Sequence, residues 1–75
     1  MAESDFPSER QALGEHVRQK RKLLGISQEE LAFRADLDRT YVSQIERGIG
    51  NPSLTVLLRL AAVLQVKIQE LVEGI

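Results

Sequence analysis

The chain has 75 residues, 43% of them hydrophobic, and a formal net charge of −1, which is the size of one small domain. It has no cysteine and one histidine, His16, which excludes disulfides, thiol nucleophiles, cysteine-based zinc sites and metal sites built from several histidines. Because the N-terminus is acidic and no apolar run approaches the roughly 18 residues of a membrane span, we expect a cytoplasmic protein without a secretory signal.

The first predicted helix follows a polar N-terminal segment. Residues 1–7 are expected to form a loose arm, ahead of a single domain over residues 8–75. Ser8 is the predicted N-cap of a helix that ends near Leu24, and Gly25 is its predicted stop. The inward positions of this helix are Leu13, Val17 and Leu24.

The same helix carries a basic cluster from Arg18 to Lys22. A near-neutral chain can still have one basic face, and attraction to phosphate depends on the local field. The alternative for this cluster is an ordinary solvated helix face. His16, which lies beside it, is interpreted as a surface residue.

Two short helices are predicted next, with very little chain between them. Ser27 and Glu30 form the pattern of a capping box, which starts a helix over residues 28–35. Eleven residues after Ser27, Asp38 has the character of a second N-cap, for a helix over residues 39–47.

This pair predicts a helix-turn-helix, in which the second helix enters the major groove of DNA. The close crossing needs a small residue, which Ala32 supplies, and the turn needs a residue that tolerates positive φ, which is Asp36. Apolar residues must also fix the second helix to the body of the domain. Those expected to do so are Leu37, Val42 and Ile45.

Two further helices complete the chain. Ser53 is the predicted cap of a helix over residues 54–64, and a short helix over residues 68–72 follows. Because no alternating β pattern persists and no repeat is present, the predicted fold is all-α, a compact arrangement of five helices.

The helix over residues 54–64 is apolar nearly all round, which favours a symmetric homodimer formed by the last two helices. In the alternative, the first and last helices simply enclose it. In the dimer, two recognition helices would lie roughly 34 Å apart and face a palindromic DNA site. The residues predicted at the dimer interface are Leu60, Val63, Val66, Ile68, Leu71 and Val72.

The stretch "SQEELAFRADLDRTYVSQIERG" resembles the helix-turn-helix of the phage lambda repressor and Cro superfamily. Within it, "LDRTYVSQIERG" is particularly similar to the small controller proteins of restriction–modification systems. The resemblance spans roughly residues 10–72 and implies a lambda-repressor-like, five-helix domain that binds operator DNA as a dimer. Asp36 departs from the family pattern, which commonly has glycine there.

The outer face of the predicted recognition helix is polar. Arg39 can donate twice to guanine O6 and N7, and Gln44 offers both a donor and an acceptor. Thr40 and Ser43 are short enough to approach bases or phosphates closely. The alternatives are a pairing of Arg39 with a nearby carboxylate, Asp36 or Glu46, and ordinary helix surface for the other residues.

Contacts to the DNA backbone are expected from residues around that helix. The resemblance implies that Gln28 contacts phosphate or supports recognition, and the alternative is a capping role. Tyr41 can reach phosphate with its hydroxyl or serve in core packing alone. Arg47 can face phosphate or solvent, and Asn51 can contact the backbone or act as a turn residue.

A carboxylate near the recognition face would repel DNA unless a cation holds it. The resemblance implies that Glu46 pairs with an arginine of the first helix, Arg18 or Arg21, so Glu46 is interpreted as structural.

The leading hypothesis is therefore a homodimeric transcriptional regulator of palindromic operator DNA, acting as repressor or activator, without cofactor or metal. The alternative is a protein-interaction module, such as an antitoxin or bridging factor, which the broad apolar surface from Leu54 onward motivates. An enzyme is not predicted, because no motif joins a nucleophile, a base and an orienting group.

Overall fold

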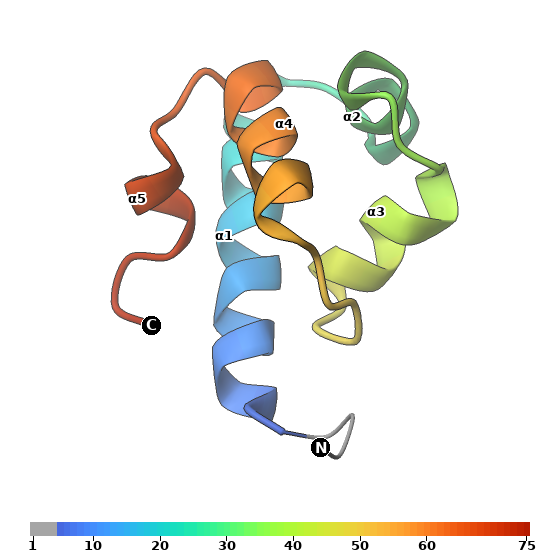
Figure 1. Cartoon of the computed structure of the whole chain (residues 1–75). Coiled ribbons are helices and arrows are strands. Elements are labelled where there is room, and N and C mark those ends of the chain that lie inside the picture. Colours follow the sequence, from blue (N-terminus) through green and yellow to red (C-terminus); the bar gives the residue numbers. More distant parts are fainter. Residues whose placement is uncertain (1–4) are drawn as a thin grey trace.

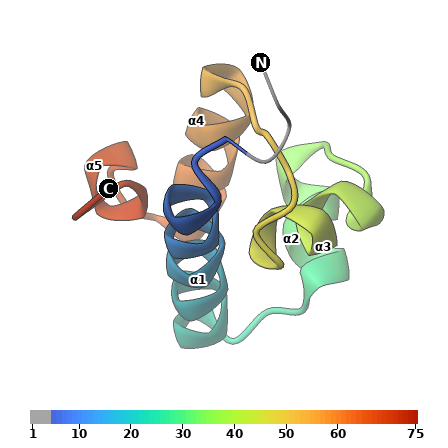
Figure 2. The ribbon, with the colours of Figure 1, turned by 90° about the horizontal axis from the view of Figure 1, so that it is seen from below.

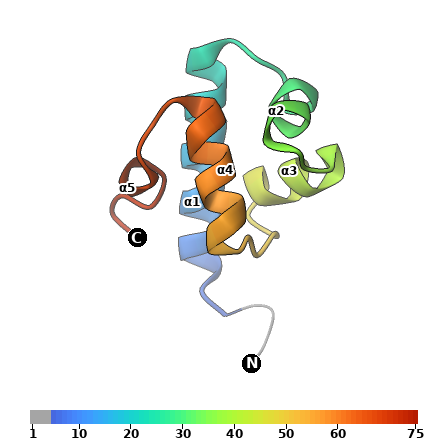
Figure 3. The same cartoon turned by 45° about the horizontal axis from the view of Figure 1, so that its top comes forward.

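The computed structural model describes residues 5–75, which contain five helices and no strand, so the predicted all-α fold is confirmed. The helices are α1 (Pro7–Leu24), α2 (Gln28–Ala35), α3 (Arg39–Glu46), α4 (Leu54–Leu64) and α5 (Ile68–Leu71). Helices α1 and α4 lie side by side in the middle of the molecule (Figure 1). Seen from below and with the top brought forward, α2 and α3 lie on one side of this pair and α5 on the other (Figures 2 and 3).

Three side-chain caps lie where the sequence predicted them, although Glu30 does not complete the predicted capping box with Ser27, because its carboxylate accepts from Arg34 Nε instead. The Ser27 hydroxyl accepts from the Glu30 backbone N–H at 3.0 Å, and Asp38 Oδ1 accepts from the Thr40 N–H at 2.9 Å. At the start of α4, the Ser53 hydroxyl accepts from the Val56 backbone N–H at 3.2 Å. Each cap contributes about 1 kcal/mol, because it satisfies a backbone donor that the helix itself leaves free.

The start of α1 differs from the prediction. The helix begins at Pro7, preceded by Phe6 in the left-handed region (φ 61°), and no side chain caps it. Proline suits the first helical position because its φ is already helical and it has no N–H to satisfy. Ser8 therefore lies inside the first turn and is not the N-cap. Of the predicted N-terminal arm, residues 1–4 lie outside the described residues.

Every helix contributes to one core. Its largest fully buried side chains are Val17, Leu31, Val42, Ile45, Leu60 and Leu71. This corrects the predicted dimer interface, because Leu60 and Leu71 are 0% exposed within a single chain and cannot contact a partner. The physical reason is that α4 is already covered by α1, α2 and α5, which use much of its apolar surface.

Polar contacts from α1 hold the short helix α5. His16 Nδ1 lies 2.8 Å from the Leu71 carbonyl oxygen, and because a carbonyl only accepts, Nδ1 is the donor. Lys20 Nζ lies 3.7 Å from Glu70 Oε1. The expectation that His16 is a surface residue was wrong, since the ring is half-buried between the two helices.

The approach of α3 to α1 depends on the absence of a side chain at Gly14. A Cβ atom at this position would collide with the carbonyl oxygen of Ile45 and lie 2.7 Å from that of Glu46. The last turn of α3 therefore rests directly on the backbone of α1.

Gly14→Ala is expected to destabilise the fold by about 1–3 kcal/mol, because the two backbones must separate to admit the methyl group. Helix propensity alone predicts the opposite sign, a gain of about 1 kcal/mol for alanine over glycine. Urea unfolding decides between them, with Gln19→Ala on the exposed side of α1 as the control. A more stable Gly14→Ala variant would contradict the close crossing.

Candidate nucleic-acid interface

The turn between α2 and α3 has the predicted chemistry. Ala32 is 2% exposed, and Asp36 ends α2 in the left-handed region with φ 58° and ψ 48°. The Leu37 N–H donates to the Ala32 carbonyl at 2.8 Å, which closes the end of α2. Aspartate is among the few residues other than glycine that adopt this conformation at modest cost, so the departure at Asp36 does not disturb the turn.

One side of helix α3 is buried in the core, and the other side is exposed to solvent. Val42 and Ile45 are 0% and 1% exposed and anchor the helix in the core. Arg39, Thr40 and Gln44 are exposed, while Ser43 is partly covered. The exposed residues carry both donors and acceptors, which is the chemistry required to read base edges.

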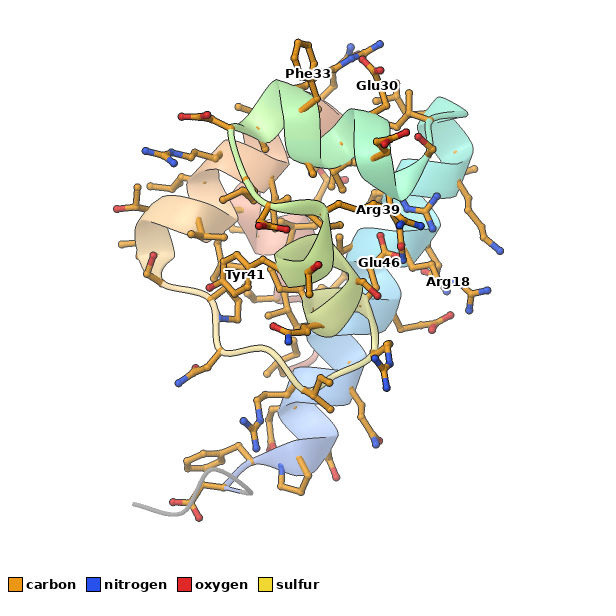
Figure 4. The ribbon with its side chains drawn as sticks, turned by 90° about the vertical axis from the view of Figure 1, so that its right-hand side faces the viewer. Arg18, Glu30, Phe33, Arg39, Tyr41 and Glu46 are labelled. Carbon is orange, nitrogen blue, oxygen red and sulfur yellow. The ribbon has the colours of Figure 1, made fainter. Side chains whose placement is uncertain are left out.

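Arg39 is not held by either of the carboxylates considered from the sequence. Within the described residues, no ion pair joins it to Asp36 or Glu46. In Figure 4, Arg39, Glu46 and Arg18 lie along one flank of α3, and Tyr41 lies on the other. The guanidinium of Arg39 is therefore available at the N-terminal end of α3.

Glu46 is the centre of a polar joint between α3, α1 and α2. Its Oε2 accepts from Arg21 Nε at 2.7 Å and its Oε1 from Arg21 Nη2 at 3.0 Å, a bidentate pair with side chains 2% and 12% exposed. Gln28 Nε2 donates to Glu46 Oε1 at 3.0 Å, and Arg21 Nη1 donates to the Ile26 carbonyl at 3.0 Å. The carboxylate is thus neutralised by Arg21 of α1 and accepts a further hydrogen bond from the neutral amide of Gln28 in α2.

The sequence does not predict two parts of this joint. The carbonyl of Ile26 orients the arginine, and the amide of Gln28 completes the coordination of the carboxylate. The available signal was the short connection Gly25–Ile26–Ser27, which keeps the start of α2 close to the end of α1. Of the two arginines considered for Glu46, Arg21 makes the contact, while Arg18 is exposed on the surface of α1.

The residues expected at the DNA backbone surround α3. Arg47 and Asn51 are exposed after the end of the helix, and Tyr41 is half-buried with its ring against the core. Gln28 lies at the first position of α2, with its amide on Glu46.

The pairing changes the acid–base behaviour of Arg21. The hydrogen bonds to Glu46 raise the pKa of Arg21 above its ordinary value, burial opposes this effect, and the charge of Glu46 adds to it. Because a raised pKa favours the folded, charged form at every pH below the ordinary arginine value, the joint persists throughout the neutral and mildly basic range.

Glu46→Ala is expected to cost about 1.5–3 kcal/mol of unfolding free energy, because it leaves the largely covered Arg21 guanidinium without its charged partner. Glu30→Ala is the matched control, since Glu30 pairs with Arg34 at 2.6 Å but both side chains are more than 40% exposed. That control should lose no more than about 0.5 kcal/mol. Equal losses in urea unfolding of the two variants would show that burial of the Glu46 pair contributes nothing.

Within the described residues, no helix combines the length and the apolar character that a membrane crossing needs.

The sequence and the structure of this chain are similar to those of known proteins. The helix-turn-helix family model matches residues 17–71. The control protein C.BamHI of Bacillus amyloliquefaciens is 44% identical over 61 residues, which cover 80% of this chain and 75% of that protein.

Two solved structures are also similar. The restriction-modification controller protein C.AhdI from Aeromonas hydrophila has a TM-score of 0.83 and 42% identity, covering 85% of this chain and 97% of that one. SinR, a master regulator for biofilm formation crystallised in complex with DNA, has a TM-score of 0.78 and 39% identity. The match covers 81% of this chain and 98% of that one. The family match and the identity to C.BamHI show that this chain belongs to the helix-turn-helix family, a family of DNA-binding regulators rather than of enzymes.

Proposed function

We propose that this helix-turn-helix protein is a sequence-specific transcriptional regulator that binds palindromic operator DNA as a homodimer. The observation that carries the proposal is the recognition face of α3. Arg39, Thr40 and Gln44 are exposed there, whereas the side chain of Glu46, in the last turn of the helix, is 2% exposed and paired with Arg21. Because Glu46 is neutralised by Arg21 and Arg39 makes no ion pair within the described residues, α3 offers a cation to a negatively charged duplex.

In this proposal, Arg39, Thr40, Ser43 and Gln44 contact base edges. Arg39 lies at the N-terminal end of α3, the part of a recognition helix that penetrates the major groove most deeply. A bidentate contact from arginine to guanine contributes about 1–3 kcal/mol of discrimination. Thr40 and Gln44 follow on the exposed side, and the partly covered Ser43 is placed at the edge of the contact.

Phosphate contacts come from Tyr41, Arg47 and Asn51, and from the N-terminal end of α2 at Gln28. Because the Gln28 amide is engaged with Glu46, the group offered to phosphate at this position is the free backbone N–H of the first turn. Arg18 joins this set. It is exposed on the same flank as Arg39 in Figure 4, so it is assigned to phosphate rather than to Glu46.

The dimer interface is revised to the apolar surface that remains exposed near α5. Val66 and Ile68 are partly buried there, and Val72 is 39% exposed. Leu58, 49% exposed, lies on the edge of α4 opposite Val63 by helical spacing. Val63 lies on the side of α4 that faces α2, beside Arg34 and Arg59, so we do not include it in the proposed interface.

A partner docked on the α5 side leaves the recognition helix open, because α1 and α4 separate α5 from α3 (Figure 1). No catalytic role is proposed for any residue.

The proposed location is the cytoplasm, where a regulator of this kind meets its DNA. If the protein is instead an interaction module, folded protein would enrich no DNA sequence.

The primary test is selection from a random duplex DNA pool by purified protein at near-physiological salt. The expected result is an enriched motif with two-fold symmetry, whose half-sites are centred about one helical turn apart. Arg39→Ala should bind the selected site more weakly by about 1–3 kcal/mol and lose preference at one position of each half-site.

Arg59→Ala is the control for this variant, since it removes the same charge from the α2–α4 side of the molecule. It should retain the full motif. An Arg39→Ala protein that enriches the unchanged motif would remove Arg39 from the base-reading set.

Val72→Asp is expected to weaken the dimer by about tenfold or more, because two-fold symmetry brings two new carboxylates into one apolar interface. Sedimentation across a concentration series measures the effect. Phe33→Asp, at an 81% exposed apolar residue of α2, should leave the dimer intact. If Val72→Asp sediments like the unmodified protein, the interface lies elsewhere.

A further inference from the structure

A second carboxylate, Asp38, lies at the recognition end of α3 and is not neutralised as Glu46 is. It is exposed and is the N-cap of the helix, where its Oδ1 accepts from the Thr40 N–H at 2.9 Å. In the part of the chain that the structure describes, no ion pair involves Asp38, and no hydrogen bond is made to its Oδ2. Its neighbour in the chain is Arg39.

The fold does not require this charge. Asparagine and serine cap helices about as well as aspartate, and the two other helices with side-chain caps begin at serines, Ser27 and Ser53. The negative charge gains a small interaction with the dipole of α3. Against that gain, the N-terminal end of a recognition helix enters the major groove between two rows of phosphates, where a carboxylate is repelled.

Only certain bases can offset that repulsion. In the major groove, cytosine presents an N4 amino donor and adenine an N6 amino donor, whereas the edges of guanine and thymine offer acceptors or a methyl group. A carboxylate beside Arg39 therefore has a partner only where a base amino group lies within its reach. One such amino group is N4 of the cytosine that pairs with a guanine contacted by Arg39, because this N4 lies next to guanine O6 in the base pair.

We propose that Asp38 is a further specificity-determining residue, whose carboxylate accepts a hydrogen bond from a base amino group, cytosine N4 or adenine N6, and disfavours every site that lacks one there. This inference rests on the proposed DNA-binding function. Asp38 raises the ratio of specific to non-specific affinity chiefly by weakening binding to the wrong DNA.

Asp38→Asn tests this with little change of shape, and it keeps the cap. Asp36→Asn is the matched control, because it removes the same charge two residues away, and asparagine also tolerates the left-handed conformation at that position. Asp36 borders the α2–α4 side beside Arg34 and Arg59 rather than the exposed face of α3. Thermal unfolding establishes that both variants fold.

Each protein is used for selection from the random duplex pool. Its affinity is then measured for the site selected by the unmodified protein and for a scrambled duplex of equal length and composition. For Asp38→Asn, the ratio of the two affinities is expected to fall about fivefold or more, with tighter binding to the scrambled duplex. The selected motif should lose its preference for cytosine or adenine at one position of each half-site, and the base lost identifies the amino group.

Asp36→Asn should shift both affinities by the same factor and leave the motif unchanged. Asp38→Ser, which caps α3 but is too short to reach a base, should lose the same preference as Asp38→Asn. The inference is overturned if Asp38→Asn changes the affinity ratio no more than Asp36→Asn does and enriches the unchanged motif. Failure of the underlying function is distinct, because the unmodified protein would then enrich no motif at all.

Discussion

The recognition surface depends on the buried pair between Glu46 and Arg21. A carboxylate in the last turn of α3 would otherwise face DNA as an uncompensated negative charge, and its removal from water would be costly. The bidentate arginine, the Gln28 amide and the Ile26 carbonyl satisfy the two charged groups in one place. Because these partners come from α1, the following loop and α2, the same contacts fix the orientation of α3 relative to the rest of the domain.

Close backbone contact makes that orientation definite. Gly14 lets the last turn of α3 rest on α1, and the small side chain of Ala32 is buried in the core. A hydrophobic core alone tolerates shifts of packed helices, whereas a hydrogen-bonded joint beside a close backbone contact allows very few arrangements. A rigid helix presents its exposed side chains to base edges without the cost of ordering them at each encounter.

The domain is small, and its apolar residues are divided between folding and association. Leu60 and Leu71 belong wholly to the core, and α5 is held to α1 by His16 and Lys20 as well as by its buried leucine. The apolar side chains that remain exposed include Leu58 on α4 and Val72 at the end of α5. This division explains why a helix that is apolar nearly all round can support both a folded single chain and a proposed dimer.

The sequence by itself determined the local structure: the caps at Ser27, Asp38 and Ser53, the left-handed turn at Asp36, and the amphipathic pattern that makes α3 polar outside. These features depend on neighbouring residues in the chain, so periodicity and cap chemistry report them directly. Only the tertiary structure decided which arginine meets Glu46, why Gly14 must be glycine, and how much of α4 a single chain covers. Those outcomes depend on the distance and angle between helices far apart in sequence, which the pattern within one helix does not encode. The first turn of α1 shows the same limit locally, where Pro7 rather than Ser8 set the boundary because an N-terminal proline needs no cap.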